Sequence, residues 1–170
     1  MAKMSTEDFK NNLNNPARLY LWDVMFTNPV GGGDAESLEL RCQTTAIPGR
    51  SLGEILIPFK ATPGIKVPGK LNMSHSWPAT FVEGTDKKVF AAIHAWNQAI
   101  INARTGIGGP DTLIKANIYI RLLDSTGACY QKIRIVGCYP QSVADVPLAF
   151  ETEGVVMYSV TFSYDYWEEA

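Results

Sequence analysis

The sequence predicts a mainly β fold, in which two packed antiparallel sheets form a sandwich or barrel with one flanking α-helix. Three observations support this class. Most segments alternate apolar and polar residues with a period of two, as half-buried strands do. Glycine and proline clusters separate these segments at short intervals, as turns do in an all-β domain. One segment alone, over residues 86–104, has the apolar spacing of an amphipathic helix.

The first part of the chain is expected to hold an arm and two strands. Residues 1–18 are polar and rich in asparagine, which predicts a short helix or an N-terminal arm. Residues 20–27 are rich in aromatic and β-favouring residues and are predicted to form a strand. Glycines at 31–33 then mark a loose hairpin turn. The second strand is expected to alternate an apolar face with a polar face (Leu38, Leu40, Cys42 and Glu39, Arg41, Gln43).

The middle of the chain is expected to leave the domain and return to it. Alternation at Ile55, Ile57 and Phe59 predicts a third strand. Residues 60–71 contain two Pro-Gly pairs, which predict a protruding hairpin or an extended loop. A further strand is expected over residues 73–81, with one face that is mostly apolar (Met73, His75, Trp77, Ala79, Phe81).

The helix is predicted over residues 86–104. Its apolar residues recur at intervals of four, three and four (Val89, Ile93, Trp96, Ile100). Thr85 or Asp86 is expected to cap its start, and Gly106 to follow its end. Three more strands are predicted, over residues 117–122, 130–136 and 156–166. The last has the clearest alternation, with one aromatic and apolar face (Val156, Tyr158, Val160, Phe162, Tyr164, Tyr166).

Composition limits the classes of function. The chain has 170 residues, which predicts a single domain over residues 1–170. Its net charge of −2 argues against a module that grips many DNA phosphates. Charged residues make up only 19% of the sequence, fewer than in most free monomers. No apolar stretch is long enough to span a membrane, and no signal peptide is recognised, so we expect reduced cysteines in a cytosol.

The sequence contains motifs that resemble ligand sites but lack their context. Gly64–Lys70 matches the phosphate-loop spacing G-x-x-x-x-G-K. Leu71 occupies the place of the Ser or Thr that would hold magnesium, and Pro68 removes one N–H from the cradle. His75 and His94 have no further His or Cys at ligand spacing. We therefore expect no catalytic, metal-binding or cofactor-binding residues, and a protein that is not an enzyme.

A series of motifs, in order along nearly the whole chain, resembles the tail tube proteins of contractile-tailed bacteriophages. It comprises NPARLYLWDV at 15–24, LRCQTTAIPG at 40–49, IPF at 57–59, IKVPGK at 65–70, Trp77, IRIVGCYP at 133–140 and VTFSYDYWE at 160–168. The resemblance implies hexameric rings that stack into a hollow tube within a contractile sheath. DNA would pass through its lumen without specific binding. The implied partners are the sheath, the baseplate hub or initiator, the tape-measure protein and the tail terminator.

The resemblance also implies a location and three sets of contact residues. The protein is expected in the phage tail of a virion and, during assembly, in the host cytoplasm. Ring-to-ring contact is expected at Ile65, Lys66, Val67 and Lys70. Glu39, Arg41 and Gln43 are expected to face the lumen, because on the predicted strand they point away from Leu38, Leu40 and Cys42. Tyr166, Trp167 and Glu168 are expected to touch neighbouring subunits. Two alternatives stay open: the tube of an injection system that carries no DNA, such as a tailocin or type VI secretion, and a small ligand-binding or enzymatic β-barrel.

Overall fold

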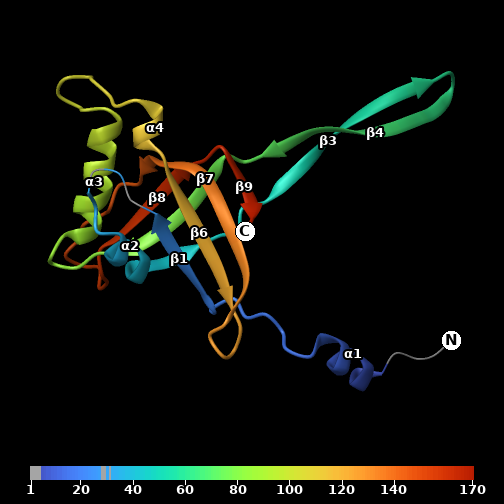
Figure 1. Cartoon of the computed structure of the whole chain (residues 1–170), viewed down its shortest axis with the longest axis horizontal. Helices are drawn as coiled ribbons and strands as arrows, with labels where there is room; N and C mark the ends of the chain where they lie inside the picture. Colours follow the sequence, from blue (N-terminus) through green and yellow to red (C-terminus); the bar gives the residue numbers. More distant parts are fainter. Residues whose placement is uncertain (1–4, 28–29, 31) are drawn as a thin grey trace.

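A computed structural model describes residues 5–27, 30 and 32–170, and shows a β body from which a long two-stranded ribbon extends (Figure 1). The helices and strands follow in the order α1 Thr6–Leu13, β1 Trp22–Thr27, α2 Ala35–Arg41, β2 Cys42–Thr45, β3 Arg50–Phe59, β4 Thr62–Met73, β5 Ser76–Val82, α3 Lys88–Ile100, α4 Asp111–Ile114, β6 Ala116–Leu123, β7 Cys129–Val143, β8 Met157–Ser163 and β9 Tyr166–Glu169.

Strand β7 takes part in both layers of the body. The first part of β7 pairs with β6 and β9, and its last part pairs with β8. Between the two parts lies Gly137, whose φ of 70° is open mainly to glycine. A Cβ at this position would also collide with the carboxylate of Asp165. The antiparallel order β1-β6-β7-β8-β5-β2 is therefore folded over at β7 into two facing sheets.

The core lies between these two layers. Phe26 of β1 faces Trp77, Phe81 and Phe162 of the opposite layer, with ring centroids 6.1–6.5 Å apart. Strand β5 buries Trp77, Ala79 and Phe81 of the predicted apolar face. The other two residues of that face do not belong to β5: Met73 ends β4, and His75, exposed with a φ of 51°, lies between the two strands. Within the described residues β1 and β2 are the two ends of the strand order and do not pair with each other, so the body is an open sandwich and not a closed barrel.

Helix α3 covers one side of the sandwich, as its apolar spacing predicted. Val89, Ile93 and Trp96 are buried, and the Trp96 indole donates to the carbonyl of Ile114 at 2.7 Å. The expected ends are wrong: the N-cap is Lys87 and neither Thr85 nor Asp86, and the helix ends at Ile100, capped by Ile101, before residue 104 and Gly106. Glu83 satisfies the first free N–H groups instead: its carboxylate accepts from the backbone of Val89 and Phe90, at 3.3 and 2.6 Å.

Two predicted strands differ from the structure. The strand expected at residues 38–43 is instead helix α2 followed by the short strand β2. Leu38 is buried while Leu40 is 74% exposed, so these residues lie on opposite faces of a helix and not on one face of a strand. The last predicted strand breaks after Ser163, and β9 joins the other sheet. No helix among the described residues has the length and apolarity of a membrane span.

Candidate functional site

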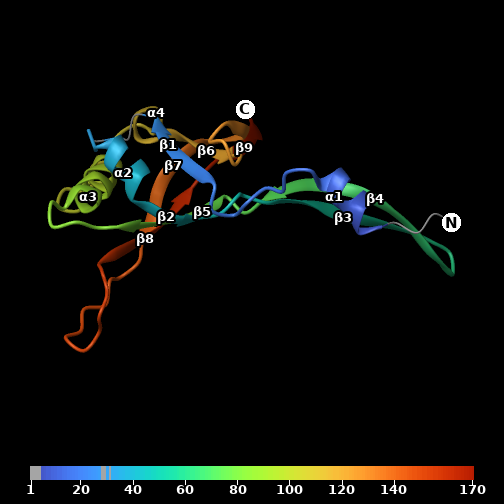
Figure 2. The ribbon, with the colours of Figure 1, turned by 90° about the horizontal axis from the view of Figure 1, so that it is seen from below.

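The β3–β4 ribbon carries several large apolar side chains that are exposed. Beyond its base it lies far from the body, as Figure 2 shows in the view turned by 90°. The register pairs Ile55 with Val67 and Ile57 with Ile65, so these four side chains share one face. Ile55, Ile57 and Ile65 are roughly half exposed or more. Because a two-stranded hairpin cannot bury its own faces, this apolar face points to a partner.

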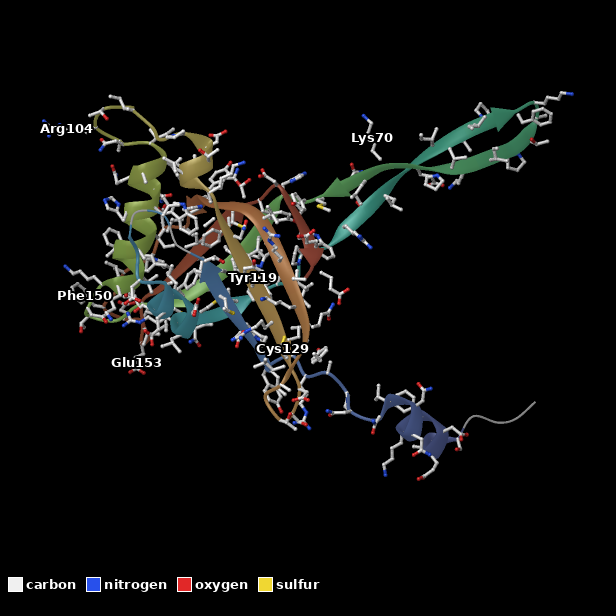
Figure 3. The ribbon with its side chains drawn as sticks, in the orientation of Figure 1. Lys70, Arg104, Tyr119, Cys129, Phe150 and Glu153 are labelled. Atoms are coloured by element: carbon white, nitrogen blue, oxygen red, sulfur yellow. The ribbon has the colours of Figure 1, made fainter. Side chains whose placement is uncertain are left out.

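The residues expected to make ring-to-ring contacts divide between the two faces of the ribbon. Ile65 and Val67 belong to the apolar face. Lys66 lies opposite Leu56 on the other face, and its ammonium is 2.6 Å from the carboxylate of Glu54. Lys70 is exposed near the base of the ribbon, where it is labelled in Figure 3. The predicted protrusion is longer than residues 60–71, because β3 leaves the body with it.

The C-terminal strand fixes the base of the ribbon to the body. The Trp167 indole donates to the carbonyl of Gly49 at 3.3 Å, and the Arg50 guanidinium lies over its ring, 5.6 Å from the centroid. Glu168 accepts a hydrogen bond from Arg134 at 3.2 Å. Of the three residues expected to touch neighbouring subunits, two thus have partners within the chain. Tyr166 is exposed, and the Glu168 side chain is also 46% exposed despite its partner.

Glu39, Arg41 and Gln43 do not share a strand face, because α2 replaces the strand on which that expectation depended. Arg41 donates to Glu83 at 3.2 Å and to Asp86 at 2.8 and 2.5 Å, which ties α2 to the start of α3. This pairing lowers the pKa of the Asp86 carboxyl below its usual range. Gln43 is exposed at the bulge in β2. That these three residues face a lumen stays a prediction, but the strand alternation that supported it is absent from the structure.

Glu39 has a separate role at the edge of the body. Its carboxylate accepts from the backbone N–H of Phe26 at 2.8 Å. Phe26 belongs to β1, which is an end strand of the sheet. A free N–H on such an edge invites pairing with another chain. Glu39 therefore occupies part of the β1 edge, whereas β2 and β9 end the two layers without such a side-chain cover among the described residues.

The N-terminal arm stands apart from the sandwich. Helix α1 begins with a complete capping box between Ser5 and Asp8, but none of its residues is buried. Phe9 and Leu13 lie one helical turn apart and are both exposed. An eight-residue helix has little stability of its own in water. The arm is thus a second surface that a partner would stabilise.

A third exposed surface was not predicted from the sequence. Residues 144–156 join β7 to β8 as an irregular loop that projects from the body. Leu148, Phe150 and Val155 in this loop are highly exposed. The sequence predicts strands on either side of this segment and none within it. A connection of more than ten residues is a signal of a functional loop.

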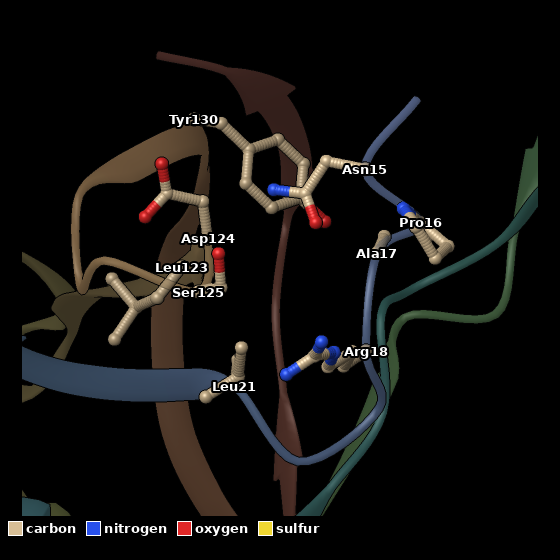
Figure 4. Close-up of a pocket in the computed structure, with 9 residues that line it drawn as sticks. All are labelled: Asn15, Pro16, Ala17, Arg18, Leu21, Leu123, Asp124, Ser125 and Tyr130. Carbon is tan, nitrogen blue, oxygen red and sulfur yellow. The ribbon is translucent and has the colours of Figure 1, made fainter. Parts of the chain in front are cut away.

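The pocket beside the N-terminal arm has its charged groups already engaged within the chain. This shallow pocket between the N-terminal arm and the β6–β7 turn has a volume of about 280 Å³ (Figure 4). Its carboxylate, Asp124, accepts from Thr126 and Ala128 within the turn, and these bonds lower the pKa of Asp124. Arg18 donates to the hydroxyl of Tyr20 at 3.2 Å. Among the described residues, no cluster of three His, Cys, Asp or Glu side chains could hold a metal.

Comparisons with known proteins give a consistent result. Residues 7–170 match the family model described as phage tail tube protein. No curated protein sequence matches the chain. A chain of an extracellular contractile injection system, the PVC sheath-tube complex in its extended state, superposes with a TM-score of 0.69 at 14% identity, covering 99% of both chains.

Two further solved structures share the fold. A chain of the anti-feeding prophage cap, a tube-terminating cap, has a TM-score of 0.69 at 15% identity over 91% of each chain. The SPP1 tail tube gives 0.51 at 14% identity, over 91% of this chain and 78% of that one. At such low identities these likenesses concern the fold alone.

Proposed function

The chain belongs to the phage tail tube protein family, and from this we propose that it forms hexameric rings that stack into the hollow tube of a contractile tail. The observation that carries the proposal is the β3–β4 ribbon. Its face of Ile55, Ile57, Ile65 and Val67 is of the kind that a folded subunit exposes only for a partner. In a stack of rings, the ribbon would reach the adjacent ring and bury this face.

Within one ring, the proposed contact is edge to edge between sheets. Strands β2 and β9 end the two layers of the sandwich. Pairing these two edges with neighbouring subunits would cover them in a closed ring, while Glu39 occupies part of the β1 edge. Tyr166, exposed on β9, would then lie in this contact, while Trp167 and Glu168 hold the base of the ribbon.

The partners proposed for the tube follow from this role. They are a contractile sheath outside it, a baseplate hub or initiator at one end, a terminator at the other and a tape-measure protein within. Structures that share the fold come from a sheath-tube complex, a baseplate and a tube-terminating cap. The proposed location is the phage tail of a virion, after assembly in the host cytoplasm. The role is structural and involves no catalysis.

The proposed cargo is DNA, which would slide through the lumen without being held. Each Lys or Arg bound to a phosphate would add affinity through counterion release. A net charge of −2 therefore suits a conduit better than a basic surface would. Glu39, Arg41 and Gln43 remain candidates for the lumen, although Arg41 is already engaged by two carboxylates.

A tube that carries no DNA is the second candidate. The likeness to chains of the PVC and anti-feeding prophage structures motivates it. Capsid and terminase genes beside this gene would favour the DNA conduit, and their absence would favour the injection system. A small ligand-binding barrel is a third class, which predicts a stable monomer.

Negative-stain microscopy of the purified protein tests the proposal. The protein is concentrated stepwise, with and without sheared tubes as seeds, and then imaged. We expect rings or stacked tubes with a central channel. A monodisperse monomer under every condition, seeded or not, would overturn the proposal.

A further inference from the structure

The loop between β7 and β8 makes few contacts with its own chain. Its bonds to the body lie at its two ends, where Ala144 donates to the carbonyl of Ser159 and Glu83 donates to that of Val156. Between these points nearly every residue is exposed. Phe150, at the projecting part of the loop, has a fully exposed ring (Figure 3). An aromatic residue in this position indicates that another surface covers it.

The loop and the ribbon carry opposite charge. Residues 144–156 contain three acidic residues and no basic one: Asp145, Glu151 and Glu153. Residues 50–73 contain four basic residues and one acidic one: Arg50, Lys60, Lys66, Lys70 and Glu54. None of the ion pairs among the described residues involves an acid of the loop. Lys60 and Lys70 have no carboxylate partner there either.

The two surfaces lie at opposite ends of the molecule. Figure 2 shows the ribbon on one side of the body and the loop on the other, and Figure 3 places Lys70 far from Phe150 and Glu153. They cannot meet within one chain. Two copies in the same orientation can bring the ribbon of one against the loop of the other. Repetition of this head-to-tail contact builds an open-ended stack.

We propose that the ribbon of one subunit packs along the 144–156 loop of a subunit in the neighbouring ring. This contact rests on the proposed function, and it identifies the surface that receives the ribbon. Phe150 and Leu148 of the loop cover the apolar face around Ile57 and Ile65. Glu151 and Glu153 then meet the basic side chains of the ribbon, which fixes the direction and position of the contact.

A charge swap tests the contact. In one variant Glu151 and Glu153 become lysine, and in a second Lys60, in the turn next to the Ile57–Ile65 pair, becomes glutamate. Each should raise the concentration needed for tube growth about tenfold or more, because like charges then face each other. The variant with all three changes should grow within about threefold of wild type. Lys66 is left unchanged because Glu54 already pairs with it, and Lys70 because it lies near the opposite end of β4.

Matched controls separate the contact from net charge and from folding. Glu36→Lys with Asp111→Lys changes the total charge as much as the loop variant does, at exposed sites elsewhere, and should leave growth unchanged. Thermal unfolding of the loop and ribbon variants should match wild type, since the changed side chains are exposed. The Glu36→Lys, Asp111→Lys control should lose no more than about 1–2 kcal/mol, because it removes the acidic residues from the first turns of α2 and α4. Carbodiimide crosslinking of wild-type tubes should join lysines of the ribbon to acids of the loop on different chains.

The outcomes distinguish this contact from the proposed function. Tubes that grow equally well after reversal, or lysines of the ribbon that crosslink only to acids elsewhere, would overturn the contact and leave the tube intact. Reversed variants that fold but are not rescued by the swap would also overturn it. Wild-type protein that never forms rings or tubes would overturn the function and the contact together.

Discussion

Replacing Ile57 and Ile65 by threonine should weaken tube growth without unfolding the subunit. The two side chains face each other across the ribbon and are 46% and 62% exposed. Full burial of an isoleucine contributes about 1.5–3 kcal/mol relative to exposure. Scaled by these exposed fractions, the pair would contribute about 2–3 kcal/mol to the contact between rings. Threonine keeps the β-branch that favours a strand.

Sedimentation of tubes over a concentration series measures the effect. A loss of 2–3 kcal/mol corresponds to a rise of about 30- to 150-fold in the concentration needed for growth. The matched control is Ile135→Thr, because Ile135 is fully buried in the core. It should cost about 2–5 kcal/mol of folding stability and lower the unfolding temperature by about 5–15 °C.

Two results would refute this reasoning. Growth of the Ile57→Thr, Ile65→Thr variant at the wild-type concentration would mean that the apolar face is not buried between rings. A fall in its unfolding temperature comparable to that of the core variant would mean that the ribbon stabilises the body itself.

Three other predictions concern the subunit alone. Gly137→Ala should destabilise the fold by about 2–4 kcal/mol in denaturant unfolding, because of its positive φ and the collision with a carboxylate. The control Gly127→Ala, where the added methyl group meets open space, should cost about 1–2 kcal/mol. Equal losses in the two variants would contradict the bend in β7. Burial raises the pKa of the Cys138 thiol to about 12. Its contribution to stability is therefore complete below about pH 8.5 and is lost as the pH rises toward the folded value, so Cys138→Ala should reduce the fall in unfolding free energy above about pH 8.5. Ser5→Ala should weaken α1 by about 1 kcal/mol, seen as faster amide exchange in that helix, with no change in the global unfolding temperature.

Long periodic segments could be predicted from sequence because burial on one face determines them. The stripe of α3 and the alternation of β5 are two examples, with Trp96 and Trp77 both fully buried. Helix α2 was missed because Leu38, Leu40 and Cys42 alternate with polar residues as in a strand, whereas in the helix Leu40 is exposed. The better signal was Asp34 at its start, whose carboxylate accepts from the backbone N–H of Ser37 at 3.2 Å.

Features that depend on tertiary contacts could not be predicted in the same way. At the bend, Gly137 lies against Asp165, a residue 28 positions further along the chain. The engagement of Trp167 with Gly49 joins positions 118 residues apart, so the exposed C-terminal contact expected from sequence is in part an internal one. The protruding segment itself was predicted, because two Pro-Gly pairs around apolar residues mark it locally.

A cryo-electron microscopy map of the assembled tube tests the central claim most directly. The account predicts stacked rings in which the β3–β4 ribbon lies against the next ring, with Ile55, Ile57 and Ile65 buried there. A tube whose ribbon remains exposed to solvent, or a protein that stays monomeric when seeded, would contradict it.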